Sequence, residues 1–169
     1  MAKNFFVLQN NPGQYILQPM IILLTAPAGS GKTTSLIQWS DQNNVTGILT
    51  PVVGGRRFFM NAATKEQFPM EATGDEETLS VGKFIFSKAG FERAVLIIRD
   101  AIHQEGWLII DEIGPLELRG EGFHDILKEV LQKRKEKIII VVREGLASQV
   151  KDHFSLQNHL VITSVSSMI

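Results

Sequence analysis

Cysteine is absent from this chain, and neither sign of charge dominates it. Without cysteine there can be no disulfide framework, thiol nucleophile or cysteine zinc site. Lys and Arg total 17 residues against 18 Asp and Glu, and the formal net charge is −1. We therefore expect no general electrostatic attraction to nucleic acid or to an acidic membrane.

Long apolar segments are missing as well. The apolar runs are far shorter than the roughly 20 residues that a membrane-spanning helix needs. A polar stretch at residues 9–13 interrupts any signal-peptide core near the N-terminus. These absences predict a soluble, cytoplasmic protein with no membrane partner. A chain of 169 residues is long enough for one domain with a three-layer core.

The most informative stretch runs from Ala26 to Thr33 and reads Ala-Pro-Ala-Gly-Ser-Gly-Lys-Thr. It follows an apolar run and precedes a helical pattern that begins at Thr34, which is the strand–loop–helix context of a phosphate-binding P-loop. Backbone N–H groups of such a loop converge on phosphate oxygens at the positive end of the helix. Because Ala26 stands where the strict pattern has glycine, an ordinary strand–helix turn stays open as the alternative.

Each residue type in this loop has an expected task. Gly29 and Gly31 let the main chain approach phosphate oxygens closely. Lys32 is expected to reach the β- and γ-phosphates, and the Thr33 hydroxyl to bind Mg²⁺. The predicted nucleotide-binding residues are Ala26, Pro27, Ala28, Gly29, Ser30, Gly31, Lys32, Thr33 and Thr34.

A pair of acidic residues, Asp111 and Glu112, follows the apolar run 107–110. A carboxylate at the end of a buried strand is costly unless something pairs with it. With a P-loop in the chain, Asp111 fits the residue that holds the Mg²⁺ shell. Glu112 is then placed where a carboxylate can orient and deprotonate an attacking water. The alternative is that both residues only form a turn before Gly114 and Pro115.

Hydrophobic periodicity predicts strands that alternate with helices. Buried strands are expected at 20–25, 107–110, 137–142 and 160–163, and helices at 34–42, 91–104, 123–133 and 146–153. This alternation is typical of an α/β fold, with a mostly parallel sheet between two layers of helices.

Two segments depart from this alternation of strands and helices. Residues 46–86 contain short extended runs around the turn signal Gly54–Gly55, and we interpret them as a small antiparallel insertion with a hairpin at 48–63. Residues 4–18 surround Pro12–Gly13 and predict an N-terminal hairpin, so that residues 1–19 extend the core. The whole chain, 1–169, is expected to form a single domain.

Several basic residues also deserve a functional interpretation. Arg143 follows the predicted strand 137–142, on the same sheet edge as the P-loop, where it could stabilise charge on a γ-phosphate or simply be a solvated arginine. Arg56 and Arg57 could fold over the triphosphate or decorate a hairpin tip. The basic run 133–137 is expected to be a solvated helix end, with nucleic-acid binding as the less favoured alternative.

Residues 111–118, Asp-Glu-Ile-Gly-Pro-Leu-Glu-Leu, resemble the DEIGxxEL signature of a family of small P-loop nucleoside-triphosphatases, the thermostable NTPases. The pieces 54–57, 81–84 and 90–92 agree with this family, and the resemblance covers residues 20–163. It implies the three-layer P-loop NTPase fold and makes Glu112 the catalytic glutamate beside the metal-shell residue Asp111.

This resemblance implies Mg²⁺-dependent hydrolysis of nucleoside triphosphates to diphosphate and phosphate, with broad base tolerance. The predicted catalytic residues are Glu112, Lys32 and Arg143, and the predicted metal ligands are Thr33 and Asp111. Two alternatives stay open. One is a kinase for a small acceptor such as a nucleoside or nucleotide. The other is a nucleotide-dependent switch or adaptor whose slow hydrolysis times a contact with a protein partner that the sequence does not identify.

Overall fold

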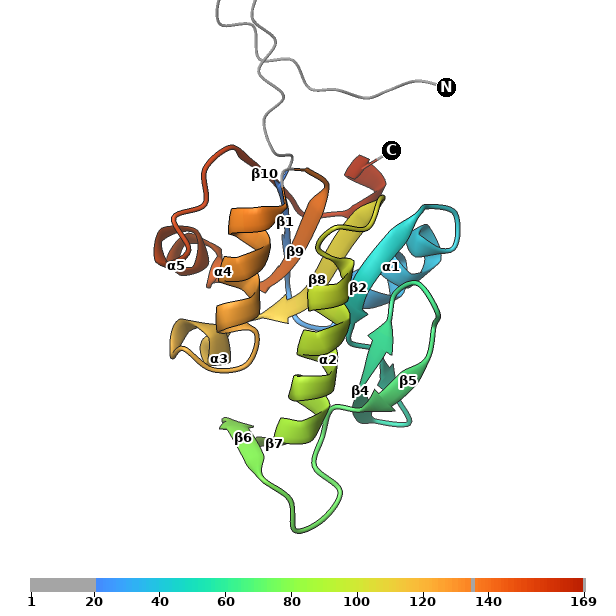
Figure 1. Cartoon of the computed structure of the whole chain (residues 1–169), viewed down its shortest axis with the longest axis vertical. Coiled ribbons are helices and arrows are strands. Elements are labelled where there is room, and N and C mark those ends of the chain that lie inside the picture. Colours follow the sequence, from blue (N-terminus) through green and yellow to red (C-terminus); the bar gives the residue numbers. More distant parts are fainter. Residues whose placement is uncertain (1–20, 135, 169) are drawn as a thin grey trace, which may run out of the picture.

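A central sheet with helices around it forms the body of the molecule, as Figure 1 shows for the computed structural model, which describes residues 21–134 and 136–168. Five strands are parallel and follow the order β10-β1-β9-β8-β2. Their bounds are β1 (Ile21–Ala26), β2 (Val45–Leu49), β8 (Trp107–Ile113), β9 (Ile138–Arg143) and β10 (His159–Ile162).

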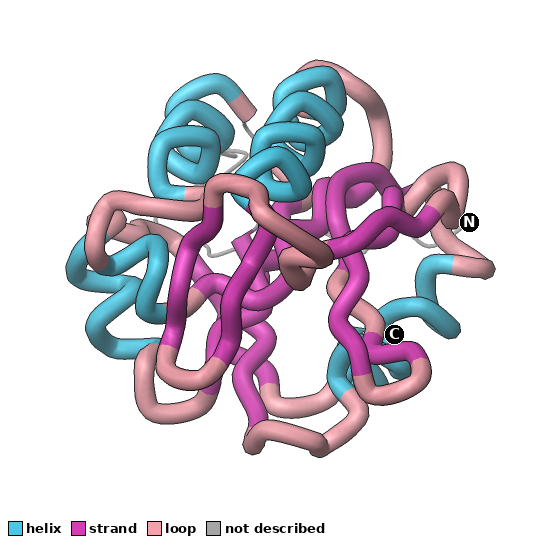
Figure 2. The backbone as a smooth tube through the Cα atoms, turned by 90° about the horizontal axis from the view of Figure 1, so that it is seen from below, coloured by secondary structure: helices cyan, strands magenta, loops and turns pink. Residues whose placement is uncertain are grey.

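Helices cover both faces of this sheet, as the view in Figure 2 shows. One face packs against α2 (Lys88–Ala101), α4 (His124–Lys133) and α5 (Ala147–His153), and the other against α1 (Lys32–Ser40) and the short 3-10 helix η1 (Val165–Met168). Successive strand residues enter the two cores in turn, with Ile110 in the first and Ile109 in the second. The predicted three-layer α/β class is confirmed.

The antiparallel block begins later than the sequence predicts. β2 pairs in parallel with β8 on one side and antiparallel with β4 (Arg56–Asn61) on the other. It is therefore a strand of the parallel core, although it lies within the predicted insertion 46–86. Its close approach to β8 requires Gly47, because a Cβ there would lie 2.1 Å from the carbonyl oxygen of Ile109.

The remaining short strands follow β2 in the chain. β3 (Val52–Val53) and β5 (Gln67–Pro69) both pair antiparallel with β4, which forms the expected hairpin at 48–63. β6 (Thr78–Val81) and β7 (Phe84–Ser87) form a separate two-stranded sheet at one end of the molecule (Figure 1). This antiparallel part lies beside β2 and contributes residues to the edge of the site.

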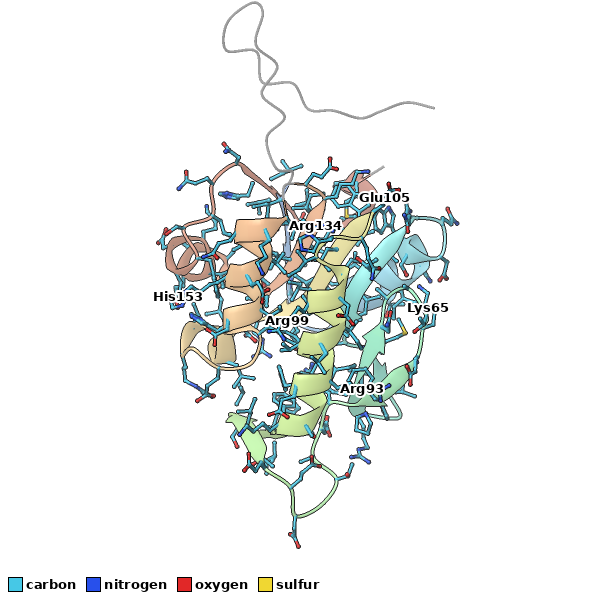
Figure 3. All side chains as sticks on the ribbon, viewed as in Figure 1. Lys65, Arg93, Arg99, Glu105, Arg134 and His153 are labelled. Carbon is cyan, nitrogen blue, oxygen red and sulfur yellow. The ribbon has the colours of Figure 1, made fainter. Side chains whose placement is uncertain are left out.

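The expectation that the basic run 133–137 is solvated is wrong for Arg134, which lies at the amino ends of the parallel strands. The side chain is buried, and Nη1 donates hydrogen bonds to the carbonyl oxygens of Ala101 at 3.1 Å, Ile102 at 3.0 Å and Gln104 at 2.8 Å. Nη2 donates to the carbonyl of Gly106. Arg134, labelled in Figure 3, thus joins the end of α2 and the loop before β8 to the end of α4.

Two expectations stay as predictions. The hairpin of residues 4–18 lies outside the described residues, and the single-domain extent of 1–169 is not tested. Within the two described ranges, no helix has both the length and the hydrophobicity to cross a bilayer.

Candidate active site

The predicted P-loop lies between β1 and α1. Gly29 and Gly31 have φ values of 75° and 82°, a left-handed conformation that glycine adopts without strain. Gly31 is the N-cap of α1, so the first N–H groups of this helix have no carbonyl partner within it. The loop and the helix dipole together give the local geometry of an anion site.

Lys32 is folded back on its own loop. Its Nζ donates to the carbonyl oxygens of Ala26 at 2.7 Å and Pro27 at 2.8 Å. Ala26 and Pro27 therefore act through these carbonyls and do not line the cavity described below. An anion in the loop would offer the ammonium group a stronger partner than these neutral oxygens.

Asp111 lies near the carboxyl end of β8, two strands away from β1, with β9 between them. Only 2% of the residue is exposed, and Oδ2 accepts three hydrogen bonds. These come from Thr33 Oγ1 at 2.9 Å, the Thr50 backbone N–H at 3.0 Å and Thr50 Oγ1 at 2.9 Å. One carboxylate oxygen thus connects α1, β8 and the residue that follows β2.

Burial raises the pKa of Asp111 to about 6, and the neighbouring charge of Glu112 adds to the rise. The hydrogen bonds from Thr50 and Thr33 act in the opposite direction, because they stabilise the carboxylate. The surrounding protein therefore stabilises the charged form of Asp111 less well than water does. This is the environment in which a nearby cation lowers the energy of the site.

Glu112 occupies an irregular position at the end of the same strand. Its φ of 70° is unusual for a residue other than glycine, and the pairing of β8 with β9 shifts register between Ile110 and Ile113. The strand expected at 107–110 continues to Ile113. The register shift is a β-bulge, which interrupts the alternation of side chains along the strand. Backbone strain of this kind is concentrated at functional positions.

Two arginines approach the carboxylate of Glu112. Nη1 of Arg57, on β4, donates to both Oε1 and Oε2 at 2.6 Å. Nη2 of Arg143, at the end of β9, lies 3.6 Å from Oε1. Thr50 Oγ1 also donates to Oε2 at 3.3 Å. The catalytic candidate is thus held by two cations and one hydroxyl.

These groups surround one cavity of about 430 Å³. The structure brings together most of the predicted residues there: Ala28, Gly29, Ser30, Gly31, Lys32, Thr33, Thr34, Asp111, Glu112 and Arg143. It adds Arg57, which the sequence left undecided, and Thr50, which the sequence analysis missed. Thr50 could have been found because it follows the core strand β2, but the sequence analysis placed most of that strand in the antiparallel insertion.

Glu117 stabilises the segment after Glu112. Its buried side chain accepts hydrogen bonds from the backbone N–H groups of Gly114 at 2.8 Å and Phe123 at 3.0 Å. Burial raises the pKa of Glu117, while these two bonds oppose the rise. It joins the residue before the short helix α3 (Pro115–Leu118) to the residue before α4, and so helps to fix the end of β8.

A family model described as NTPase matches residues 21–168 of the chain. The chain belongs to this family. It is 32% identical over 143 residues to the nucleoside-triphosphatase THEP1 of Thermococcus kodakarensis, which covers 73% of this chain and 76% of the relative. It is 33% identical over 139 residues to the nucleoside-triphosphatase THEP1 of Methanothermobacter thermautotrophicus, covering 76% and 80%. The predicted resemblance and the assignment as a nucleoside-triphosphatase are confirmed.

Two solved structures of nucleoside-triphosphatases have a similar fold. A human cancer-related nucleoside triphosphatase aligns with a TM-score of 0.62 at 23% identity, over 87% of this chain and 89% of that one. THEP1 from Aquifex aeolicus aligns with a TM-score of 0.63 at 23% identity, over 85% and 88%. This likeness confirms the predicted P-loop NTPase fold.

Proposed function

We propose that this NTPase-family chain hydrolyses nucleoside 5′-triphosphates to the diphosphate and phosphate in a Mg²⁺-dependent reaction, with Glu112 as the general base. The observation that carries this proposal is the convergence of three parts in one cavity: the P-loop with Lys32, the buried Asp111, and Glu112. Phosphoryl transfer is catalysed mostly by positioning and charge stabilisation, and these parts supply both.

Binding would begin at the P-loop. The loop N–H groups from Gly29 to Thr33 are proposed to hold the β- and γ-phosphates. Lys32 would exchange its bonds to the carbonyls of Ala26 and Pro27 for phosphate oxygens, because a charged acceptor gives a stronger hydrogen bond than a neutral one. Lys32 then neutralises charge on the bridging and γ oxygens during the reaction.

The residues at the base of the cavity fit a hard divalent cation. Thr33 Oγ1 lies 2.9 Å from Asp111 Oδ2, so a hydroxyl and a carboxylate are already together, and oxygen ligands are those that Mg²⁺ prefers. Thr33 and Asp111 are therefore the residues that would hold it. When bound, Mg²⁺ would neutralise charge on the β- and γ-phosphate oxygens. Among the described residues, no cluster of three or more His, Cys, Asp or Glu offers another metal site.

Glu112 would accept a proton from the water that attacks the γ-phosphorus. The new bond joins the water oxygen to phosphorus, and the bond between phosphorus and the β–γ bridging oxygen breaks, which releases the diphosphate. Arg143 lies 3.6 Å from Glu112 and lines the same cavity, so it is placed to stabilise charge on the γ-phosphate. All these groups act on the triphosphate or the water, which supports broad base tolerance.

Phosphate release from ATP, GTP, CTP and UTP, with and without Mg²⁺, tests this proposal. We expect similar rates for the four nucleotides with Mg²⁺, and Glu112→Gln should lower the rate about 10²- to 10⁴-fold while nucleotide binding persists. Glu121→Gln is the matched control, because Glu121 is an exposed glutamate paired with Arg119 away from the cavity. Native turnover in Glu112→Gln would remove the assigned base. Labelled phosphate on an added nucleoside would support a kinase instead.

A further inference from the structure

Glu112, the proposed general base, forms a hydrogen-bonded ion pair with Arg57. Both carboxylate oxygens accept from Nη1 of Arg57 at 2.6 Å, and Oε2 also accepts from Thr50 Oγ1 at 3.3 Å. A general base needs an oxygen directed at the water that it deprotonates. In this arrangement both oxygens already face other donors. Each oxygen has a second lone pair, but the one that faces Arg57 is not open to water, so release of this contact would leave Glu112 freer to act on water.

A change of partner would require only the side chain of Arg57 to move. Its backbone N–H donates to Glu71 Oε1 at 3.0 Å, and the residue pairs with Val52 across the β3–β4 ladder, so its main chain is fixed. The side chain is 20% exposed and its guanidinium lies 4.8 Å from the ring centre of Phe84. Rotation of a long, partly exposed side chain is enough to change its partner.

The cavity gives Arg57 a second partner when it holds a triphosphate. Arg57 lines the same cavity as the P-loop, together with the cations Lys32 and Arg143. The cavity is thus lined by three cations and by the two carboxylates of Asp111 and Glu112, and this excess of positive charge favours the entry of a polyanion. A terminal phosphate carries more charge than a carboxylate, and its oxygens match the planar guanidinium equally well.

We propose that Arg57 distinguishes triphosphate from diphosphate and couples this to the release of Glu112. In the structure it occupies both oxygens of Glu112. When a triphosphate enters, Arg57 transfers to the γ-phosphate and leaves Glu112 free to accept a proton from water. A diphosphate lacks the group that attracts Arg57, so the contact with Glu112 persists. The inference rests on the proposed function in one respect, namely that Glu112 is the base.

The test measures nucleotide binding and not the rate of hydrolysis. Loss of Arg57 would change that rate in two ways at once, because it both frees Glu112 and removes a contact with phosphate. Calorimetry would give the affinities for ADP and for a non-hydrolysable ATP analogue, each with Mg²⁺. The ratio of the two affinities is measured for the native chain, Arg57→Ala, Glu112→Gln and the double variant. Arg56→Ala is the matched control, because Arg56 is the neighbouring arginine, is 52% exposed, and lies 3.9 Å from Glu71.

We expect Arg57→Ala to lower the preference for the triphosphate analogue by about 10- to 100-fold, the effect of one charge-assisted hydrogen bond. The loss should appear both with Glu112 present and in the Glu112→Gln background, while ADP affinity stays unchanged. Glu112→Gln should increase the preference more when Arg57 is present than when it is absent, because only then does binding have to break the ion pair. Arg57→Lys should restore part of the preference, and Arg56→Ala should match the native chain.

An unchanged preference in Arg57→Ala would overturn the proposal. So would a loss that occurs with Glu112 present and vanishes in the Glu112→Gln background, since Arg57 would then only screen the charge of Glu112. If Arg57→Ala unfolds at lower temperature, Arg57→Met, which keeps an unbranched side chain and removes the charge, provides the same reading in a folded chain. Failure of this inference and failure of the proposed function are distinguishable: native turnover in Glu112→Gln would remove the assigned base, while the preference of Arg57 for a triphosphate is still measured by binding.

Discussion

The two ends of the parallel sheet both carry a hollow and buried charge, yet they are built differently. At the amino ends, a cavity of about 660 Å³ lies beside Arg134, whose guanidinium donates to a set of fixed backbone carbonyls. At the carboxyl ends, the cavity is smaller, about 430 Å³, and its charges are held by partners that an anion can displace.

The difference shows that cavity size alone does not mark the site. Arg134 has its hydrogen bonds satisfied by oxygens that belong to the fold, so the charge serves to join segments of the chain. Lys32 instead binds two carbonyls of its own loop, and Arg57 binds a side-chain carboxylate. A phosphate can replace both kinds of partner, because it offers charged acceptors. The anion site is at the carboxyl end because the N-terminus of α1 lies there.

The largest expected effect that tests this contrast is on stability at the amino end. Arg134→Met removes the donors to the carbonyls of Ala101, Ile102 and Gln104, and should lower the free energy of unfolding by about 3–5 kcal/mol. Urea unfolding measures this loss, and KM for ATP should stay nearly constant. Lys133→Met is the control, because this neighbouring side chain is exposed and should change stability by at most about 0.5 kcal/mol. A large rise in KM with unchanged stability would mean that the two ends are not separate.

A comparable change in binding is expected at the carboxyl end. Lys32→Ala should weaken the affinity for a non-hydrolysable triphosphate about 100-fold, because it removes charge-assisted bonds to phosphate. Stability should change little, since Lys32 gives up only two bonds to carbonyls of its own loop. Calorimetry provides the affinity, and Lys65→Ala, which removes a partly exposed lysine paired with Asp41, is the control. An equal loss in both variants would indicate an unspecific charge effect.

The buried acid should make stability depend on pH. Asp111 has a pKa of about 6 in the folded chain against an ordinary value of 3.8, so the folded state binds the proton more tightly between these values. The free energy of unfolding therefore falls as pH rises from about 4 to 6, and the penalty is complete above that range. Asp111→Asn lacks this titration.

Relative to the native chain, Asp111→Asn should gain stability between pH 4 and pH 7, by up to about 3 kcal/mol. Urea unfolding at both pH values, with a chelator and without nucleotide, provides the comparison. The control is Asp125→Asn, because the Asp125 side chain is 95% exposed. The same difference at both pH values would contradict the assigned effect of burial.

The smallest expected effect concerns the hydroxyl that the two acids share. Thr50→Val removes the bonds from Oγ1 to Asp111 Oδ2 and Glu112 Oε2 and keeps the shape of the side chain. We expect kcat to fall about 10-fold with a smaller change in KM, since the acids lose positioning and the phosphate loop is untouched. Thr46→Val tests the same replacement on β2, the strand that Thr50 follows, where the hydroxyl makes only a 3.4 Å contact with the Trp107 carbonyl. Equal losses in both variants would point to the strand and not to the shared hydroxyl.

Much of the phosphate site could be predicted because its signals are local in the chain. The P-loop, the strand before it and the helix after it are contiguous, and Asp111–Glu112 directly follow an apolar run. The strand β2 was harder to assign, since Val45–Leu49 is short, contains Gly47 and continues into a hairpin. Periodicity reports that such a strand is buried but not which strand it pairs with.

The sequence by itself therefore determined the α/β alternation, the anion loop and the acidic pair, because each depends on neighbouring residues. Only the tertiary structure decided which side chains meet those acids. Arg57 is 55 positions from Glu112, and Thr50 is 61 positions from Asp111. The strand order and the fold of the antiparallel part bring these residues together, and no local preference of the chain encodes that contact.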